Sequence, residues 1–134
     1  MLAPDLVAYL DSVTSLTAGT DLFEGPMPEK PDSCVAITPT GGEEGDYTMG
    51  PSLSAPGVEY GRFQLAVRRA TKTLAQSDAL AYYALLANLG PITLGAGVLY
   101  HNVESLDGEP YSIGQDANDL WRCVCNFRAT KARG

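Results

Sequence analysis

The sequence is poor in residues that carry out chemistry, with one histidine and three cysteines among 134 residues. An odd number of cysteines argues against a disulfide scaffold and favours a reducing compartment. No apolar run approaches the roughly 18 residues that a membrane-spanning helix needs, and the first residues lack the basic segment of a secretory signal. The sequence also lacks a nucleophile elbow, a phosphate-binding loop and a metalloprotease helix. We therefore expect neither a membrane span nor an enzyme.

The cysteines do not form a metal-binding pattern. Cys123 and Cys125 would place two thiolates on one face of a strand, but a structural zinc site needs four ligands. Only Cys34 and His101 could complete the set, and they belong to separate segments with no paired motif. Cys123 and Cys125 also share the strand face of Phe127, where a free cysteine behaves as a small hydrophobic side chain. The sequence predicts buried core cysteines, with no metal and no cofactor.

Composition and charge predict one globular domain over residues 1–134. Hydrophobic residues make up 45% of the chain and charged residues 19%, which is typical of soluble domains. The net charge of −7 is spread unevenly: residues 1–59 hold ten acids and one base, whereas residues 60–134 hold six acids and eight bases. This asymmetry indicates two faces of different potential, although solvated loop acids would give the same pattern. The overall sign disfavours general binding to nucleic-acid phosphates.

Two segments are predicted to be helices. The first spans about residues 4–14, where apolar side chains recur at helical spacing. The second begins near Thr73, because Thr73 and Gln76 have the spacing of a capping box. Gly90 and Pro91 are expected to end it.

Four segments are predicted to be strands: residues 33–38, 58–71, 97–106 and 119–131. They are β-branched or alternate between apolar and polar residues, as half-buried strands do. In the third segment this alternation places His101 on the same face as Val103. Residues 107–119 are rich in turn formers and are expected to form a loop. The element order is α-β-β-α-β-β. This order favours the α+β class, with an antiparallel sheet of about four strands and two helices packed on one face.

A long loop is predicted between the first two strands. Residues 41–57 contain five glycines and three acids and offer little that could build a core. Loops of this length without structure are uncommon in compact domains and are usually functional or disordered. Two interpretations stay open, namely a disordered surface loop and an arm that becomes ordered against another surface.

Basic residues gather around the second and the last predicted strands. They are Arg62, Arg68, Arg69 and Lys72, followed by Arg128, Lys131 and Arg133. One interpretation is a solvated strand face and a frayed tail. The other is a contact with the acids Glu43, Glu44 and Asp46 of a neighbouring subunit, because complementary charges fix the register of an interface.

Three segments together resemble the tail terminator and minor capsid proteins of long-tailed bacteriophages. The first is PDSCVAITPTGG, a strand followed by the double glycine that opens the long loop. The second is RFQLAVRRAT, a strand that leads directly into an alanine-rich helix. The third is EPYSIGQDANDLWRCVCNFRAT, a family-like turn followed by an aromatic-rich strand. The turn residues that carry this resemblance are Pro110, Ile113, Gly114 and Asp116.

The resemblance implies a structural virion protein that catalyses no reaction. Such a protein assembles as a hexameric ring on the head-proximal end of the tail tube, stops tube polymerisation and presents a surface to the head-tail connector. The implied partners are other copies of the chain, the major tail tube protein and the connector or head-completion protein. DNA passes through the lumen without sequence-specific binding. The implied location is the virion tail of a siphophage, after assembly in the host cytoplasm.

In such a ring, the loop over residues 41–57 becomes an arm. Its acids would line the lumen, where negative charge repels DNA, or would meet the basic strand face of a neighbour. Tyr47 and Met49 are the only large apolar residues of the loop before Leu53, so we expect them to anchor the arm when it docks.

Two other functions stay open on the sequence alone. One is a neck or head-completion protein, which belongs to the same general class of virion components. The other is a small α+β domain that binds or hydrolyses a small molecule with His101 and a cysteine, since such partners meet in space rather than in sequence.

Overall fold

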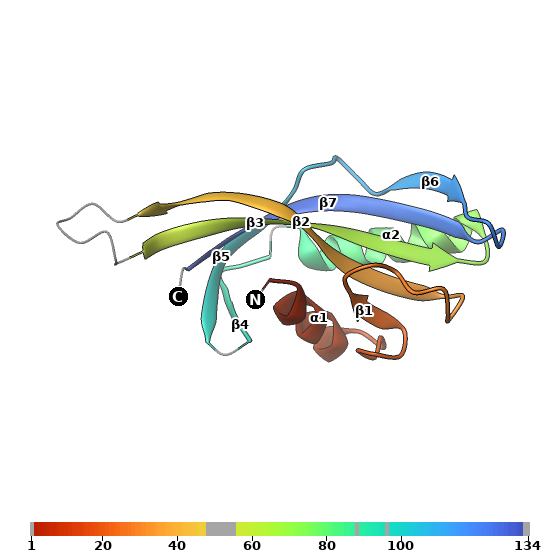
Figure 1. Ribbon diagram of the computed structural model, residues 1–134, viewed down its shortest axis with the longest axis horizontal. Coiled ribbons are helices and arrows are strands. Elements are labelled where there is room, and N and C mark those ends of the chain that lie inside the picture. The colour runs from red at the N-terminus through yellow and green to blue at the C-terminus, as the bar shows by residue number, and fades with distance from the viewer. Residues whose placement is uncertain (1, 48–55, 88, 96, 133–134) are drawn as a thin grey trace.

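The computed structural model describes residues 2–47, 56–87, 89–95 and 97–132, and for residues 42–47, 56–59 and 132 it describes the backbone alone. The described residues form two helices, one followed by three strands and the other by four (Figure 1). They are α1 (Leu2–Val13), β1 (Leu22–Glu24), β2 (Cys34–Tyr47), β3 (Pro56–Arg69), α2 (Lys72–Leu86), β4 (Ile92–Leu94), β5 (Val98–Ser105), β6 (Tyr111–Gln115) and β7 (Trp121–Ala132).

The strands form one mixed sheet that is larger than the sequence predicts. Its order is β1-β2-β3-β7-β5-β4, and β6 pairs with β7. β1 runs parallel to β2, and the other pairs are antiparallel. The α+β class agrees with this arrangement, but the prediction of about four antiparallel strands is wrong in number and order. The missed strands β1, β4 and β6 have three to five residues, which is too short for a period-2 pattern to stand out.

The predicted long loop is largely a β-hairpin. β2 continues through Gly41 to Tyr47, and β3 already begins at Pro56. We call residues 41–47 and 56–61 the arm, which extends beyond the helices in Figure 1. The pairing shifts register three times between Pro39 and Tyr47, and such bulges twist and bend a strand. The sequence predicts no strand over residues 41–47 because their glycines and acids show no period-2 pattern.

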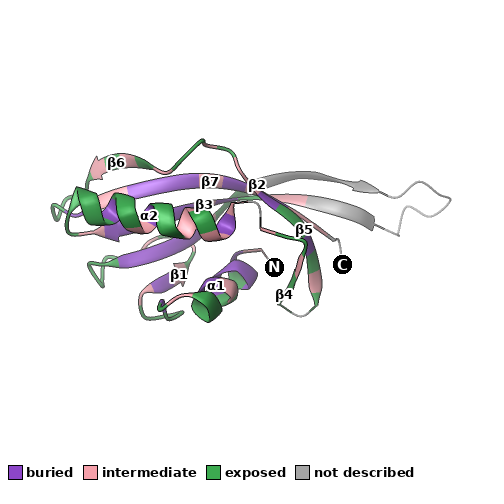
Figure 2. Ribbon diagram, turned by 180° about the vertical axis from the view of Figure 1, so that it is seen from behind, coloured by how far each residue is buried: buried purple, intermediate pink, exposed green. Residues whose placement is uncertain are grey.

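The core lies between the helices and one face of the three long strands. Val35 of β2 lies opposite Val67 of β3, which in turn lies opposite Cys123 of β7. The rings of Phe63 and Phe127 stack with centroids 5.1 Å apart. Buried residues concentrate on these strands and on one side of each helix (Figure 2). The helices contribute Leu6, Leu10, Ala75, Ala79 and Leu86 to the same cluster.

A buried polar contact fixes α1 against the sheet. The Tyr100 hydroxyl of β5 donates a hydrogen bond to Asp5 Oδ2 of α1 at 2.8 Å, and both residues are buried. Gly95 comes so close that a Cβ there would collide with the Asp5 carboxylate, and its φ is +58°. Since such a backbone favours glycine, the β4–β5 connection and α1 constrain each other.

The predicted assignment of β5 side chains to the two faces of the sheet is wrong. The pairing with β7 shifts between Tyr100 and Asn102, so that Tyr100 and Val103 are both buried. His101, which the alternation places beside Val103, is exposed. A one-residue slip reverses the faces of a strand, and the sequence carries no signal for the bulge.

The start of α2 also differs from the prediction. The helix begins at Lys72, and Thr71 is its N-cap, with Thr71 Oγ1 accepting a hydrogen bond from Leu74 N at 3.2 Å. The capping box predicted at Thr73 and Gln76 is therefore wrong, because both residues lie inside the helix. The chain turns at Ala87, three residues before the predicted stop at Gly90.

We expect Thr71→Ala to lower the free energy of unfolding by about 1 kcal/mol, the usual cost of removing an N-cap side chain. Thr73→Ala is the matched control. It should leave the stability unchanged or raise it slightly, since alanine is the better helix former. Urea denaturation of both variants measures the difference, and equal effects would contradict Thr71 as the cap.

Candidate assembly surfaces

The described residues give no support to a metal or thiol centre. They contain no cluster of three metal-ligating side chains. Burial raises the pKa of the thiols of Cys34, Cys123 and Cys125, which keeps them protonated and weakly nucleophilic. His101 is exposed whereas the three cysteines are buried, so the proposed pairing of His101 with a cysteine has no geometric support. Neither α1 nor α2 is long and apolar enough to span a membrane.

The acids expected at an interface lie on the arm. In its backbone pairing, Glu43 lies opposite Tyr60 and Asp46 lies opposite Val58. Glu44 and Tyr47 belong to the same strand, β2. Met49 lies outside the described residues. The structure therefore places these acids on a projecting hairpin rather than on an irregular loop.

Two of the expected basic residues meet at the base of the arm. Arg62 of β3 lies directly opposite Arg128 of β7. Arg62 is exposed. Arg128 Nε donates a hydrogen bond to Glu104 Oε1 at 2.7 Å, and its guanidinium lies 5.6 Å from the centre of the Tyr60 ring. Acids on the arm and arginines at its base thus give this end of the molecule both signs of charge.

Arg68 lies at the other end of β3 and is engaged within the chain. It is 6% exposed. Its guanidinium donates hydrogen bonds to the backbone carbonyls of Pro28, Glu29, Pro31 and Asp32 at 2.6–3.1 Å. These bonds hold the β1–β2 connection against the sheet. A buried charge is costly unless it is well hydrogen-bonded, and four carbonyls meet that need.

Arg69 links β3 to α2. Its Nε donates to Asp78 Oδ2 at 2.7 Å, and Nη1 donates to the carbonyl of Cys34 at 3.3 Å. The phenol of Tyr82 lies 3.5 Å from Arg69 Nη2. Burial raises the pKa of Tyr82, so the phenol stays neutral beside the arginine. The basic residues that look alike in the sequence thus occupy three different environments: the base of the arm, the buried clamp on the β1–β2 connection, and the link between β3 and α2.

The family-like turn is partly a strand. Ile113 and Gly114 belong to β6, which pairs with β7, while Pro110 precedes the strand and Asp116 follows it. Gly114 has a φ of +91° next to a register shift, a conformation that favours glycine. Asp116 Oδ1 accepts hydrogen bonds from the amides of Asn118 and Leu120 at 2.8 and 3.0 Å. The pKa of Asp116 is lowered, and the largest cause is the hydrogen bond from the backbone of Leu120.

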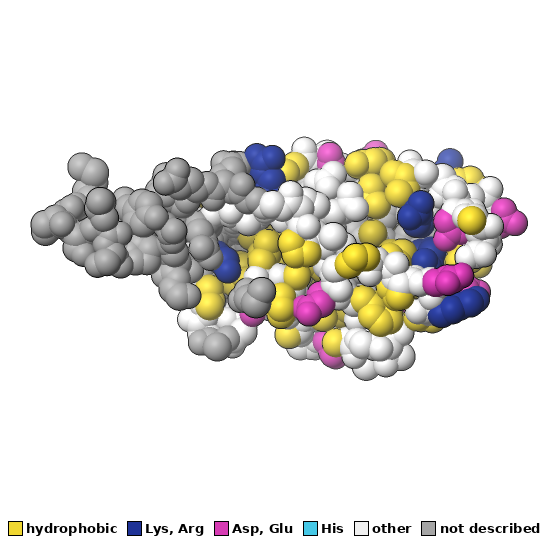
Figure 3. All heavy atoms as spheres, in the orientation of Figure 1, with side chains coloured by type: hydrophobic (Ala, Val, Ile, Leu, Met, Phe, Trp, Pro, Cys, Tyr) yellow, Lys and Arg dark blue, Asp and Glu magenta, His cyan; other side chains and the backbone are white. Residues whose placement is uncertain are grey.

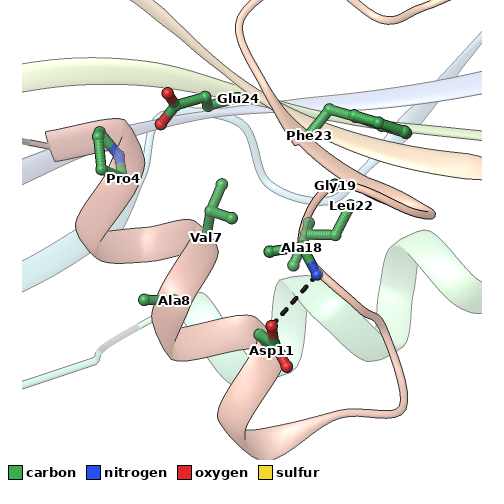
Figure 4. Close-up of a pocket in the computed structure, with 9 residues that line it drawn as sticks. All are labelled: Pro4, Val7, Ala8, Asp11, Ala18, Gly19, Leu22, Phe23 and Glu24. Carbon is green, nitrogen blue, oxygen red and sulfur yellow. Dashed lines mark hydrogen bonds between the residues drawn. The ribbon is translucent and has the colours of Figure 1, made fainter.

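Sequence reasoning missed a groove between α1 and β1. We call it the α1–β1 groove; its volume is about 540 Å³. Figure 4 shows Val7 and Asp11 of α1 pointing toward the segment that carries Ala18 and Leu22, and the amide of Ala18 donates to Asp11 Oδ2 at 3.2 Å. The remaining lining residues are Pro4, Ala8, Gly19, Phe23 and Glu24. No sequence signal could have located the groove, because its second wall is the missed strand β1.

Comparison with known proteins gives a family and a fold. Residues 9–133 match the family model described as bacteriophage tail terminator protein. A chain of a solved structure entitled "Virion of native gene transfer agent (GTA) particle" has the same fold, with a TM-score of 0.62 over 98% of both chains and 18% sequence identity. No curated protein matches the chain.

We expect Arg68→Lys to lower the free energy of unfolding by about 2 kcal/mol. A lysine ammonium cannot reach four carbonyls with a fixed fork of donors, and hydrogen bonds to charged groups contribute roughly 1.5–3 kcal/mol each. Arg62→Lys, at an exposed position of the same strand, should change stability by less than about 0.5 kcal/mol. Chemical denaturation compares the two, and a neutral Arg68→Lys would contradict the clamp.

Proposed function

Because the chain belongs to the bacteriophage tail terminator family, we propose that it stops growth of a tail tube by closing the head-proximal end as a homo-hexameric ring. Family membership makes it a structural protein of a phage-type tail, and the match over residues 9–133 is the observation that carries the proposal. The ring would join the last tube ring on one side and the head-tail connector on the other.

The arm supports this function. It is a long hairpin outside the helix-covered part of the sheet (Figure 1). A projecting hairpin offers backbone and side chains to other subunits, whereas the folded body does not need it for its core. Glu43, Glu44, Asp46, Tyr47 and Met49 are the residues we propose for contact with a neighbouring subunit or the tube.

The basic residues form the other part of the proposed interface. Arg62 and Arg128 stand at the base of the arm, where acids from a neighbour's arm could reach them. Arg69 and Arg68 lie at the other end of β3 and are engaged within the chain. Their proposed share in the interface is therefore to hold the surface in shape.

The proposed mechanism is capping rather than catalysis. One face of the ring must be complementary to the tube, and the opposite face must not resemble a tube ring, or polymerisation would continue. DNA would cross the lumen during ejection without specific binding. Acids that face the lumen would repel phosphates and keep the passage clear.

Removing the protein should produce abnormally long tails, because nothing would stop tube polymerisation. Tail length is measured by electron microscopy of lysates of cells in which particles assemble without the chain. Expression of the intact chain in trans is the control. Tails of normal length would contradict the proposal. Normal tails that stay separate from filled heads would instead indicate a neck protein.

Neutralising the arm with Glu43→Gln, Glu44→Gln and Asp46→Asn together should reduce DNA-delivering particles about ten-fold or more, since losing about 1.4 kcal/mol at an interface changes its equilibrium constant ten-fold. The matched control removes the same charge elsewhere, with Glu29→Gln, Glu109→Gln and Asp119→Asn at exposed positions. Long tails would assign the acids to a subunit contact, and normal tails with slow DNA exit would assign them to the lumen. Unchanged delivery would refute both roles.

A further inference from the structure

Two unlike edge strands, β1 and β6, lie on opposite sides of the sheet and are joined by one row of paired residues. Leu22 of β1 lies opposite Val35, and the register continues through Val67 and Cys123 to Ser112 of β6. Among the described strands, none pairs with the outer side of β1 or of β6. Beside β1, an isolated bridge joins Ala18 to Leu22, the amide of Leu22 donates to the carbonyl of Thr17, and the amide of Gly19 donates to the carbonyl of Leu22. A head-to-tail ring requires two unlike surfaces on each subunit, and these edges are unlike.

The β1 edge presents a cavity with an apolar floor and an acidic rim. Val7 and Leu22 of the α1–β1 groove are buried. Asp11 and Glu24, which line the same groove, are exposed. A partner for this groove needs an apolar projection with a cation beside it.

The β6 edge presents that combination. Tyr111 and Ile113 are 44% and 47% exposed, although both are large apolar residues. Arg122 of β7 lies opposite Gly114 of β6, and its Nε is buried without a hydrogen-bond partner among the described residues. Figure 3 shows hydrophobic side chains gathered beside a cationic one over the end of the molecule that carries β6 and β7. A buried donor without an acceptor is costly, so an incoming carboxylate would stabilise this site.

We propose that β6 of one copy seats in the α1–β1 groove of a second copy, with Tyr111 and Ile113 on the apolar floor and Arg122 against the acidic rim at Glu24. The proposal rests on the proposed ring, because it names the two surfaces that join neighbouring subunits. Each copy carries one groove and one β6 edge on opposite sides of its sheet, so the contact repeats from subunit to subunit.

Charge selects this occupant over the arm. The arm carries Glu43, Glu44 and Asp46, and like charges placed together cost free energy. An acidic rim at Asp11 and Glu24 therefore repels a neighbour's arm. The β6 edge carries a cation, Arg122, beside the Asp116 carboxylate, whereas residues 41–47 and 56–61 of the arm contain no lysine or arginine that could pair with the rim.

Cross-linking in assembled tails tests the contact. Ala18 is exposed and points into the groove (Figure 4), and Gln115 is an exposed residue of β6, so a chain with Ala18→Cys and Gln115→Cys carries both halves of the interface. A short bismaleimide should convert these chains into a ladder of covalent multimers in tails of normal length. The native cysteines are at most 1% exposed, and the wild-type chain checks that they do not react.

The matched controls separate this contact from others. Gln115→Cys with Leu80→Cys, an exposed position on α2, should give at least ten-fold less multimer. Ala18→Cys chains mixed with Gln115→Cys chains should stop at dimers. No ladder in tails of normal length, or Ala18→Cys linked to a tube or connector protein, would overturn the proposal. Normal tails in the complete absence of the chain would instead refute the terminator function, irrespective of cross-links.

A charge exchange gives a second readout. Arg122→Glu should reduce covalent multimers at least ten-fold, because it opposes the acidic rim. Adding Glu24→Arg in the same chain should restore them, since every subunit then offers the reversed pair. Restoration by Glu29→Arg, at an exposed acid outside the groove, would overturn the pairing of Arg122 with Glu24.

Discussion

Alternate residues of β2, β3 and β7 must face the two helices together, and this single register constrains the rest of the molecule. Val35, Val67 and Cys123 define one layer of it, and the stacked Phe63 and Phe127 define another. A slip of one residue would move every apolar side chain to the opposite face. β2 and β3 are longer than the helix-covered core, and they continue outward as the arm through three shifts of register.

The constraint explains which elements the sequence could predict. β7 and the body of β3 alternate because one face is buried, and the apolar positions of the helices recur for the same reason. β1, β4 and β6 are short edge elements whose pairing is decided by tertiary contacts. The glycines and acids of residues 41–47 look like a loop, so the sequence does not predict that β2 continues through them. The bulge in β5 reverses His101 without any local signal.

The candidate surfaces were predictable to a similar extent. Residue type identified the acids of the arm and the arginines of β3 and β7 as unusual. It could not distinguish Arg68, which is buried under four carbonyls, from Arg62, which is exposed. The α1–β1 groove could not be predicted at all, because its walls are a helix and a short missed strand that tertiary packing brings together.

The architecture allows two kinds of contact to vary independently. The proposed lateral contact uses β1 and β6, whose positions are set by the same register that builds the core, so its geometry is as rigid as the core. The arm extends beyond the helices (Figure 1), and at its base Gly61 lies against Leu2 of α1. A ring needs fixed angles between subunits to close, whereas a contact with tube or connector must fit a partner that is not a copy of itself. Rigid edges suit the first requirement, and a projecting hairpin suits the second.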